Sequence, residues 1–435
     1  MTPPPLLIAH CRQLLTLAGA KPPRRGRQLA ELGLVRDGAM LVADGRIAAV
    51  GPTRTVEKHP LAAKAEKLDA HHWVVLPGFV DSHTHLVFPA SRVDEYEQRI
   101  RGLSYRQIAR RGGGILATVK RLRQAPAELL LDQARQRLVE FARHGTTTLE
   151  AKSGYGLDLA NELKILEVIQ ALNHEGPLEL VATFLGAHVV PPEYKRKPQA
   201  YVDFLIHRLI PGVAGRGLAE FCDVFCDRGA FTISQARQIL RAGRVSGLEP
   251  RLHADQLART GATRLAVELH AASADHLECI TRADVRALAR SDTVATLLPG
   301  AVFHLGKDTY PPARALIDAG AAVALATDFN PGTSPTLNMQ IILSLACTRM
   351  RMTPAEAIGA STLNAAYALR RAHRIGSLAL GKQADLIAIE LSDYREIPYY
   401  FGVNFCRLAV KRGQIIYGQG GVLTPPYKRQ NQHGL

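Results

Sequence analysis

The chain has few cysteines, few aromatic residues and no long apolar run, and each shortage excludes a class of protein. Its six cysteines are scattered and form no Cys-x-x-Cys pair, which argues against a disulfide framework or a zinc ribbon. No apolar run approaches the ~20 residues that are needed to cross a bilayer. The N-terminus also lacks the basic and apolar regions of a secretory signal. We therefore expect a cytoplasmic protein with reduced thiols and no membrane partner.

Acidic residues are also in short supply, since 54 Lys and Arg face 39 Asp and Glu and leave a formal net charge of +15. Such a balance can indicate a nucleic-acid partner. The basic clusters, however, lie far apart, at residues 21–27, 110–111, 370–371 and 428–429, and aromatic residues make up only 6% of the chain. Nucleic-acid binding normally combines a basic surface with aromatic residues. The sequence therefore predicts no nucleic-acid partner, and the charge is better explained by solvated faces or attraction of an anionic substrate.

Apolar strand patterns alternate with helical ones over most of the chain. Residues 161–172 have apolar residues at helical spacing. Thr353, Pro354 and Glu356 form an N-cap, a proline at the first helical position and a capping-box glutamate. Eight strands are predicted, at residues 75–80, 146–149, 178–184, 221–225, 250–253, 272–276, 294–298 and 322–326. Eight strands with interleaved helices indicate an α/β fold, a (β/α)8 TIM-like barrel.

The two ends of the chain have a different pattern. Residues 38–51 form two alternating strands around an Asp-Gly pair, which predicts a hairpin. Short strand patterns recur within residues 384–423. Neither end is large enough to fold alone, so we expect the N- and C-terminal segments to form one small composite β-domain. The predicted division is 1–72 and 376–435 for that domain and its tail, and 73–375 for the (β/α)8 barrel.

The most informative segment is residues 76–85, Leu-Pro-Gly-Phe-Val-Asp-Ser-His-Thr-His. In an extended chain, the spacing of His83 and His85 aims both rings to the same side, so they can share a metal ion. Isolated His-x-His triplets are common and are weak evidence for a metal. Here the pair follows a predicted strand, and the carboxyl ends of barrel strands are where such folds place their active sites.

Further polar residues follow other predicted strands, namely His188, His253, His276 and Asp328. Any one of them alone is more often a hydrogen-bonded structural residue, but convergence at one rim favours a site. His83, His85, His253 and Asp328 offer three nitrogens and a carboxylate, which suit one Zn²⁺ or Fe ion per chain. Cys222 and Cys226 lie on the fourth strand, where a carbamylated lysine would bridge two metals, and Lys152 lies on the second. A single metal is therefore expected.

The order of these ligands resembles the amidohydrolase superfamily. Longer motifs resemble the imidazolonepropionase family, which opens the imidazolone ring in histidine degradation. The resemblance extends from about residue 14 to residue 378. The Lys-Ser-Gly-Tyr-Gly and Thr-Asp-Phe-Asn-Pro-Gly segments are more specific to this family than His-x-His. The motifs are residues 149–156 (Leu-Glu-Ala-Lys-Ser-Gly-Tyr-Gly), 223–226 (Asp-Val-Phe-Cys), 273–277 (Ser-Ala-Asp-His-Leu) and 326–333 (Ala-Thr-Asp-Phe-Asn-Pro-Gly-Thr).

The resemblance implies hydrolysis of 4-imidazolone-5-propanoate to N-formimidoyl-L-glutamate (EC 3.5.2.7). A bound metal would activate the attacking water. Asp328 is expected to take its proton and later help to deliver it to the leaving ring nitrogen. His276 is expected to polarise the carbonyl or stabilise the oxyanion. An alternative is that His276 only orients the site.

The substrate contacts implied by the resemblance are Arg92, Tyr155, His188, Gln256, Asn330, Gly332 and Thr333. A guanidinium can grip the propionate with two hydrogen bonds, which suits Arg92. Some relatives carry a glutamate where this chain has Gln256, and an amide cannot act as a base. Gln256 is therefore expected to bind the ring, which leaves proton transfer to Asp328 and His276. The glycine run 112–114 is a candidate flap but is more often a turn.

Two other interpretations stay open. Another mononuclear amidohydrolase, such as a heterocycle deaminase, would share the metal set but would not need Arg92 and Tyr155 for a propionate arm. A catalytically silent barrel that serves as a binding protein would be expected to have lost a ligand, and this sequence has all of them. The expected partner is a small molecule with a carboxylate arm, and a homodimer is the candidate assembly.

Overall fold

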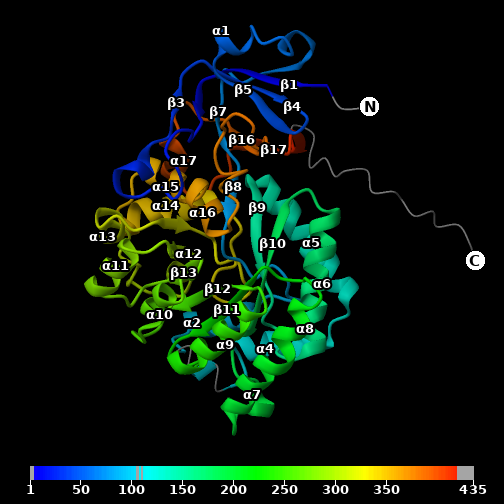
Figure 1. The fold of residues 1–435 in the computed structure, drawn as a ribbon, viewed down its shortest axis with the longest axis vertical. Helices are drawn as coiled ribbons and strands as arrows, with labels where there is room; N and C mark the ends of the chain where they lie inside the picture. The colour runs from blue at the N-terminus through cyan, green and yellow to red at the C-terminus, as the bar shows by residue number, and fades with distance from the viewer. Residues whose placement is uncertain (1–3, 104–106, 109–110, 419–435) are drawn as a thin grey trace, which may run out of the picture.

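The computed structural model describes residues 4–103, 107–108 and 111–418, and its centre is a barrel of eight parallel strands (Figure 1). Each strand pairs with the next along the chain, and a parallel bridge between Thr84 and Phe329 links the first to the last. This confirms the predicted (β/α)8 barrel. The strands are β8 (Phe79–Asp81), β9 (Thr146–Lys152), β10 (Glu179–Ala187), β11 (Phe221–Cys226), β12 (Glu249–Ala254), β13 (Ser273–His276), β14 (Val294–Leu297) and β15 (Val323–Leu325).

Helices surround the barrel and cover its strands (Figure 1). Residues 161–172 lie in a long helix as predicted, and the Thr353 capping box is present with Pro354 at the first turn. The principal helices are α2 (Val93–Ile100), α4 (Ile115–Gln124), α5 (Ala127–Arg143), α6 (Leu159–Glu175), α7 (Pro198–Phe204), α8 (Ile210–Ala214), α9 (Ile233–Val245), α10 (Ala262–Glu268), α11 (Arg282–Ala289), α12 (Pro299–His304), α13 (Ala313–Asp318), α14 (Met339–Met350), α15 (Pro354–Ala360) and α16 (Leu363–Ala368).

The first predicted strand, residues 75–80, is in fact two strands in two sheets. β7 (Val74–Pro77) pairs with strands from both ends of the chain, whereas β8 pairs with β9 in the barrel. The break falls at Gly78, where an added Cβ would lie 2.3 Å from the side chain of Thr147. Only glycine fits this close approach, so the apolar run crosses from one sheet to the other there.

The small β-domain is composite, as the sequence predicted, and lies at the top of Figure 1. One sheet has six strands drawn from both ends of the chain, and the other has four N-terminal strands. β7 lies within the predicted barrel range 73–375 but belongs to the six-stranded sheet, and the residue boundaries of the domains stay a prediction. The six strands run β18 (Gln414–Tyr417), β17 (Cys406–Lys411), β16 (Leu386–Ile389), β7, β2 (Gln13–Leu15), β3 (Leu34–Val35); the four run β5 (Arg46–Pro52), β4 (Gly38–Ala43), β1 (Leu6–Cys11), β6 (Glu66–Asp69).

The predicted hairpin joins β4 to β5 through Asp44 and Gly45, whose φ angles are +51° and +74°. Two successive positive φ values are typical of the tight turns that match the twist of a hairpin. A cluster that includes Ile8, Met40 and Leu386 packs between the two small sheets. One apolar cluster joins the barrel and its helices to part of the β-domain, and two smaller clusters lie within the β-domain.

All six cysteines are unpaired, in agreement with the sequence. Within the part of the chain that the structure describes, no helix combines the length and apolar character that a membrane span requires. The basic residues 428–429 and the tail after Pro425 lie outside the described residues.

Candidate metal centre and substrate pocket

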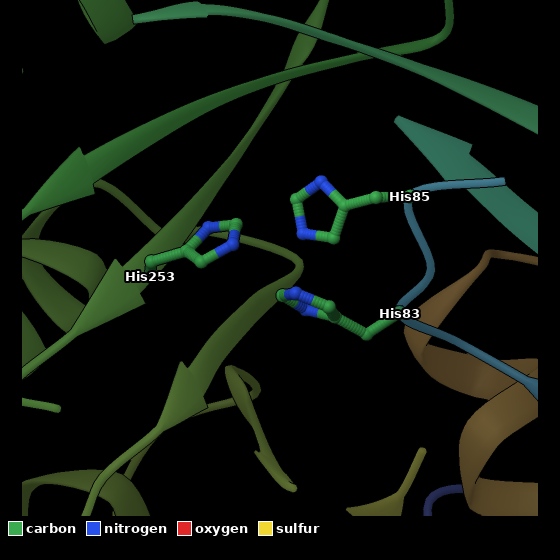
Figure 2. Close-up of side chains that lie close together, drawn as sticks. All are labelled: His83, His85 and His253. Carbon is green, nitrogen blue, oxygen red and sulfur yellow. The ribbon is translucent and has the colours of Figure 1, made fainter. Parts of the chain in front are cut away.

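Three histidines converge at the carboxyl end of the barrel strands. His83 and His85 follow β8, His253 lies near the end of β12, and their rings approach one another from two sides (Figure 2). The ring centroids of His83 and His253 are 4.5 Å apart, and His85 lies 5.5 and 5.6 Å from them. One nitrogen of each ring lies within 4.8 Å of the others. The predicted histidine ligands therefore lie within reach of one ion.

Asp328 completes the donor set. It follows β15, and its Oδ1 lies 3.6 Å from Nε2 of His83 and 3.6 Å from Nε2 of His85. Its φ of +54° places it in the left-handed region, which aspartate tolerates better than most residues. Burial raises the pKa of Asp328 to about 6, although His276 and His253 oppose the shift. The four predicted ligands are thus gathered in one buried cluster.

The chemistry of the donor set fits a metal. Burial lowers the pKa of His83 and His85 well below its usual range, so both rings are neutral and can coordinate. Nε2 of His83 and Nε2 of His253 are buried without a hydrogen-bond partner among the described residues. Buried polar atoms are normally satisfied, and a bound ion would satisfy these.

Two carboxylates orient the ligand rings from behind. His83 Nδ1 donates a 2.7 Å hydrogen bond to Asp275 Oδ2, which leaves Nε2 to face the site. His253 Nδ1 lies 3.0 Å from Asp223 Oδ2. Carboxylates in this position fix the tautomer of metal-binding histidines and raise their basicity. Both aspartates belong to motifs in the sequence, but neither has a predicted role.

His276 ends β13 and faces the same cluster. One of its ring nitrogens lies within 4.8 Å of ligand atoms of both His83 and Asp328. Its Nδ1 is 3.5 Å from Glu278 Oε1. Burial alone would lower the pKa of His276, but Glu278 raises it above its ordinary value. His276 can therefore donate a proton or hydrogen bond beside the donor set, and its placement outside the ligand shell stays a prediction.

Three of the four metal donors, His85, His253 and Asp328, line a pocket beside the cluster. Concave sites that combine apolar walls with a few polar groups are typical of small-molecule binding. Six of the seven predicted substrate contacts line the pocket, and Gly332 lies just behind one of them, Arg92. The six are Arg92, Tyr155, His188, Gln256, Asn330 and Thr333.

Arg92 is the strongest candidate for an anion contact. Its backbone precedes α2, and its side chain is buried. Nε and Nη1 are buried and have no hydrogen-bond partner in the described segments, while the nearest carboxylate, Glu95, lies 3.8 Å from Nε. Unsatisfied guanidinium donors that line a pocket are suited to a carboxylate ligand.

His188 presents one nitrogen to the pocket. Its Nδ1 lies 3.0 Å from the carbonyl oxygen of Gly154, and burial lowers its pKa to about 3, so the ring is neutral. Nδ1 is therefore the donor, and Nε2 can accept a hydrogen bond from a ligand. The ring stacks on His85 at 5.2 Å, and Tyr155 lies 5.3 Å from it. Gly154 has a φ of +104°, and a Cβ there would lie 2.7 Å from the backbone of Leu185.

Asn330 organises the loop after β15. Its Oδ1 accepts from the backbone nitrogens of Gly332 and Thr333 at 2.9 and 2.7 Å, and its Nδ2 donates to the Asp328 carbonyl oxygen at 2.7 Å. The amide atoms are thus used within the loop. This arrangement favours a role in shaping the pocket wall, and direct contact of Asn330 with a substrate stays a prediction.

Comparison with known proteins adds to this geometry. The profile of the Amidohydrolase family matches residues 74–416. An imidazolonepropionase of Solibacter usitatus is 50% identical over 94% of this chain and 98% of its own length. That of Geobacillus kaustophilus is 46% identical over 96% and 99%. The chain belongs to the imidazolonepropionase family.

Solved structures of other enzymes share the architecture of this chain. An adenosine deaminase from Xanthomonas campestris has a TM-score of 0.69 with 18% identity, over 97% of this chain and 94% of that one. At this level of identity the likeness supports the fold alone. The curated relatives confirm the resemblance of the chain to imidazolonepropionases.

Several pocket residues of this imidazolonepropionase family member were missed in the sequence. Ile115, Phe225, Leu257, Leu305 and Lys307 also line the pocket. Ile115 begins α4 directly after the glycine run 112–114, in which Gly114 donates to Glu95 Oε1 at 2.9 Å. The run is thus a turn that brings Ile115 to the pocket. Leu305 and Lys307 lie just after α12, and no strand or ligand pattern marks them in the sequence.

Proposed function

We propose that the chain hydrolyses the ring amide of 4-imidazolone-5-propanoate and yields N-formimidoyl-L-glutamate, a step of histidine degradation. The observation that carries this proposal is the buried guanidinium of Arg92, whose Nε and Nη1 have no hydrogen-bond partner among the described residues, in the same pocket as three of the metal donors. A cyclic amide with a propionate arm needs both features. The names of the curated relatives support the same reaction.

The proposed cofactor is one Zn²⁺ or Fe ion, held by His83, His85, His253 and Asp328. Three imidazoles and one carboxylate are a donor set that suits either ion. Such an ion would supply a water that is nucleophilic at neutral pH. Amidohydrolases are metal-dependent, and the histidine-rich cluster of the chain fits that requirement.

The remaining pocket residues would bind and orient the substrate. Arg92 would bind the propionate, and the Tyr155 hydroxyl would donate a hydrogen bond to the same carboxylate. Nε2 of His188 would accept a hydrogen bond from the ring. Gln256 would hydrogen-bond the ring, because its amide cannot serve as a base. Fixing both ends of the substrate holds the carbonyl carbon beside the donor set.

Two groups, Asp328 and His276, would carry out proton transfer and hydrogen-bond donation during the reaction. Asp328 would accept a proton from the attacking water as the new C–O bond forms. It would then return the proton to the ring nitrogen as the C–N bond breaks, so that the second carboxylate of the product appears where the amide was. His276, whose pKa is raised by Glu278, would donate a hydrogen bond to the oxygen that gains negative charge.

The direct test is hydrolysis of 4-imidazolone-5-propanoate by metal-replete protein, with the product identified by mass spectrometry. We expect formation of N-formimidoylglutamate without release of ammonia. Release of ammonia from a heterocyclic amine would instead indicate a deaminase.

An Arg92→Lys variant keeps the positive charge but loses the paired donors of the guanidinium. Its kcat/KM should therefore fall roughly tenfold or more while its metal content is unchanged. Unchanged kcat/KM would place the propionate elsewhere.

The assembly and the location are part of the proposal. We expect a cytoplasmic enzyme whose partner is the small-molecule substrate, assembled as a homodimer. Light scattering coupled to size-exclusion chromatography would give the mass of the particle. A mass near 47.3 kDa, that of one chain, would contradict the homodimer.

A further inference from the structure

A buried lysine lies beneath the metal donors and has no part in the mechanism described above. Lys152 ends β9, and its side chain is fully buried. Its Nζ donates to Asp223 Oδ2 at 2.7 Å and to Glu150 Oε1 at 2.8 Å, and lies 3.9 Å from Asp275 Oδ2. One ammonium group therefore lies within 4 Å of three carboxylates.

Two of those carboxylates are the ones that contact the ligand rings. Asp223 lies behind His253, and Asp275 accepts the hydrogen bond from His83. His83 follows β8 and His253 lies on β12, so the two ligands come from non-neighbouring strands. Lys152, on β9, contacts both carboxylate–histidine pairs. It is thus the point at which their positions are coupled.

Arg251 is the second cation of this cluster. Its Nη2 donates to the Ser82 carbonyl oxygen at 2.8 Å and lies 3.4 Å from Asp275 Oδ2, and its Nε lies 3.2 Å from Glu150 Oε1. Burial opposes the charge of Lys152, but Asp223 and Glu150 keep its pKa above the ordinary value. The cluster thus contains three carboxylates and two cations, which give it a formal net charge of −1 directly behind the metal donors.

A cluster of this kind is not explained by stability. Taking several charges out of water costs free energy, and replacing buried ion pairs by apolar residues is often neutral or stabilising. A functional explanation is that the geometry and net charge of the cluster act on the histidine ligands. Groups behind metal-binding histidines tune the affinity for the metal.

We propose that Lys152 is a positioning residue that holds both carboxylate–histidine pairs of the metal centre and thereby sets the affinity for the metal. The inference rests on the metal centre proposed above. Lys152 acts through Asp223 and Asp275, and it belongs neither to the proposed ligands nor to the residues that line the pocket. Its loss lets the two carboxylates move apart, so His83 and His253 no longer present their Nε2 atoms at a common point.

The chain offers a matched control in Lys411. This lysine is also buried, and its Nζ contacts Asp385 Oδ2 at 2.7 Å, Thr148 Oγ1 at 3.0 Å and Glu179 Oε2 at 3.2 Å. Thr148 and Glu179 are register partners at the start of β10, whereas Lys152 pairs with Thr183 further toward the carboxyl end. Lys411→Met therefore removes a similar cation on the side of the barrel away from the ligands.

The experiment measures metal affinity rather than turnover. Purified parent, Lys152→Met and Lys411→Met proteins are stripped of metal and titrated with Zn²⁺ in competition with a chromogenic chelator. We expect the Kd to rise about 10- to 100-fold in Lys152→Met, and to remain at the parent value in Lys411→Met even if both variants melt at lower temperature. The visible spectrum of bound Co²⁺ should change only in Lys152→Met.

Lys152→Gln covers the case in which Lys152→Met does not fold. The shorter, neutral amide can donate to Asp223 but cannot also reach Asp275, so the Kd should still exceed that of the parent. A parent-like Kd and Co²⁺ spectrum in whichever variant folds would overturn the inference, as would an equal loss of affinity in Lys411→Met. A parent chain that binds no metal would instead overturn the proposed metal centre.

Discussion

The guanidinium of Arg92 lies directly against the Cα of Gly332, where an added Cβ would fall 1.2 Å from Nη2. The two residues come from different barrel loops, the one before α2 and the one after β15. Their backbones are joined as well, because Arg92 N donates to the Pro331 carbonyl oxygen at 3.2 Å. The absence of a side chain at position 332 is therefore what leaves room for the proposed carboxylate-binding group.

Gly332→Ala should displace the Arg92 side chain and weaken substrate binding. We expect kcat/KM to fall about tenfold or more, chiefly through KM, with metal content unchanged. Steady-state kinetics and elemental analysis of the same samples measure both. In an Arg92→Met background the methyl group has no guanidinium to displace, so Gly332→Ala should then have little further effect. Equal losses in both backgrounds would show that the methyl group acts on something else.

The proposed metal centre predicts how many ions each chain binds and how strongly that binding depends on His253. The parent should contain about one ion per chain, as expected for a single four-donor site. His253→Ala should lose most of that metal, because three donors hold a divalent ion poorly. Elemental analysis after dialysis against metal-free buffer measures the content. Two ions per chain in the parent would contradict a mononuclear centre.

Much of this site could be predicted because its residues lie where strands end. His83, His85, His253 and Asp328 follow or end apolar segments, and parallel strands bring those ends together. The strands themselves were found from apolar runs of typical length. The exception is the run broken at Gly78, since hydrophobic patterns do not show that one run serves two sheets.

The carboxylates behind the ligands could not be predicted in the same way. Asp223 lies opposite Arg251 in the register of β11 and β12, and His253 lies opposite Asp275 in that of β12 and β13. Those pairings depend on the stagger of neighbouring strands, which a single sequence does not contain. Lys152 was considered only as a metal bridge, and its contacts with Asp223 and Asp275 emerge from the three-dimensional structure.

The capping box of α15 gives a prediction on stability alone. Thr353 Oγ1 accepts from Glu356 N at 3.3 Å, and Glu356 Oε2 accepts from Thr353 N at 2.7 Å. Thr353→Ala removes the first bond and should lower the free energy of unfolding by about 1 kcal/mol. Equilibrium unfolding in urea measures the change. Metal content and kcat should match the parent, and a change in either would mean that α15 influences the site.

The final prediction separates the roles of Asp328 and His276. Asp328→Asn can still offer an oxygen to the metal but cannot accept a proton, so it should retain part of its metal and lose roughly 10²-fold or more in kcat. His276→Asn should instead keep its full metal content while losing activity, because the ligand set proposed here does not include it. Comparing kcat per bound ion in the two variants corrects for any lost metal. Near-parental turnover of metal-loaded Asp328→Asn would assign the base to His276 or another group, and loss of metal in His276→Asn would place that ring in the ligand shell.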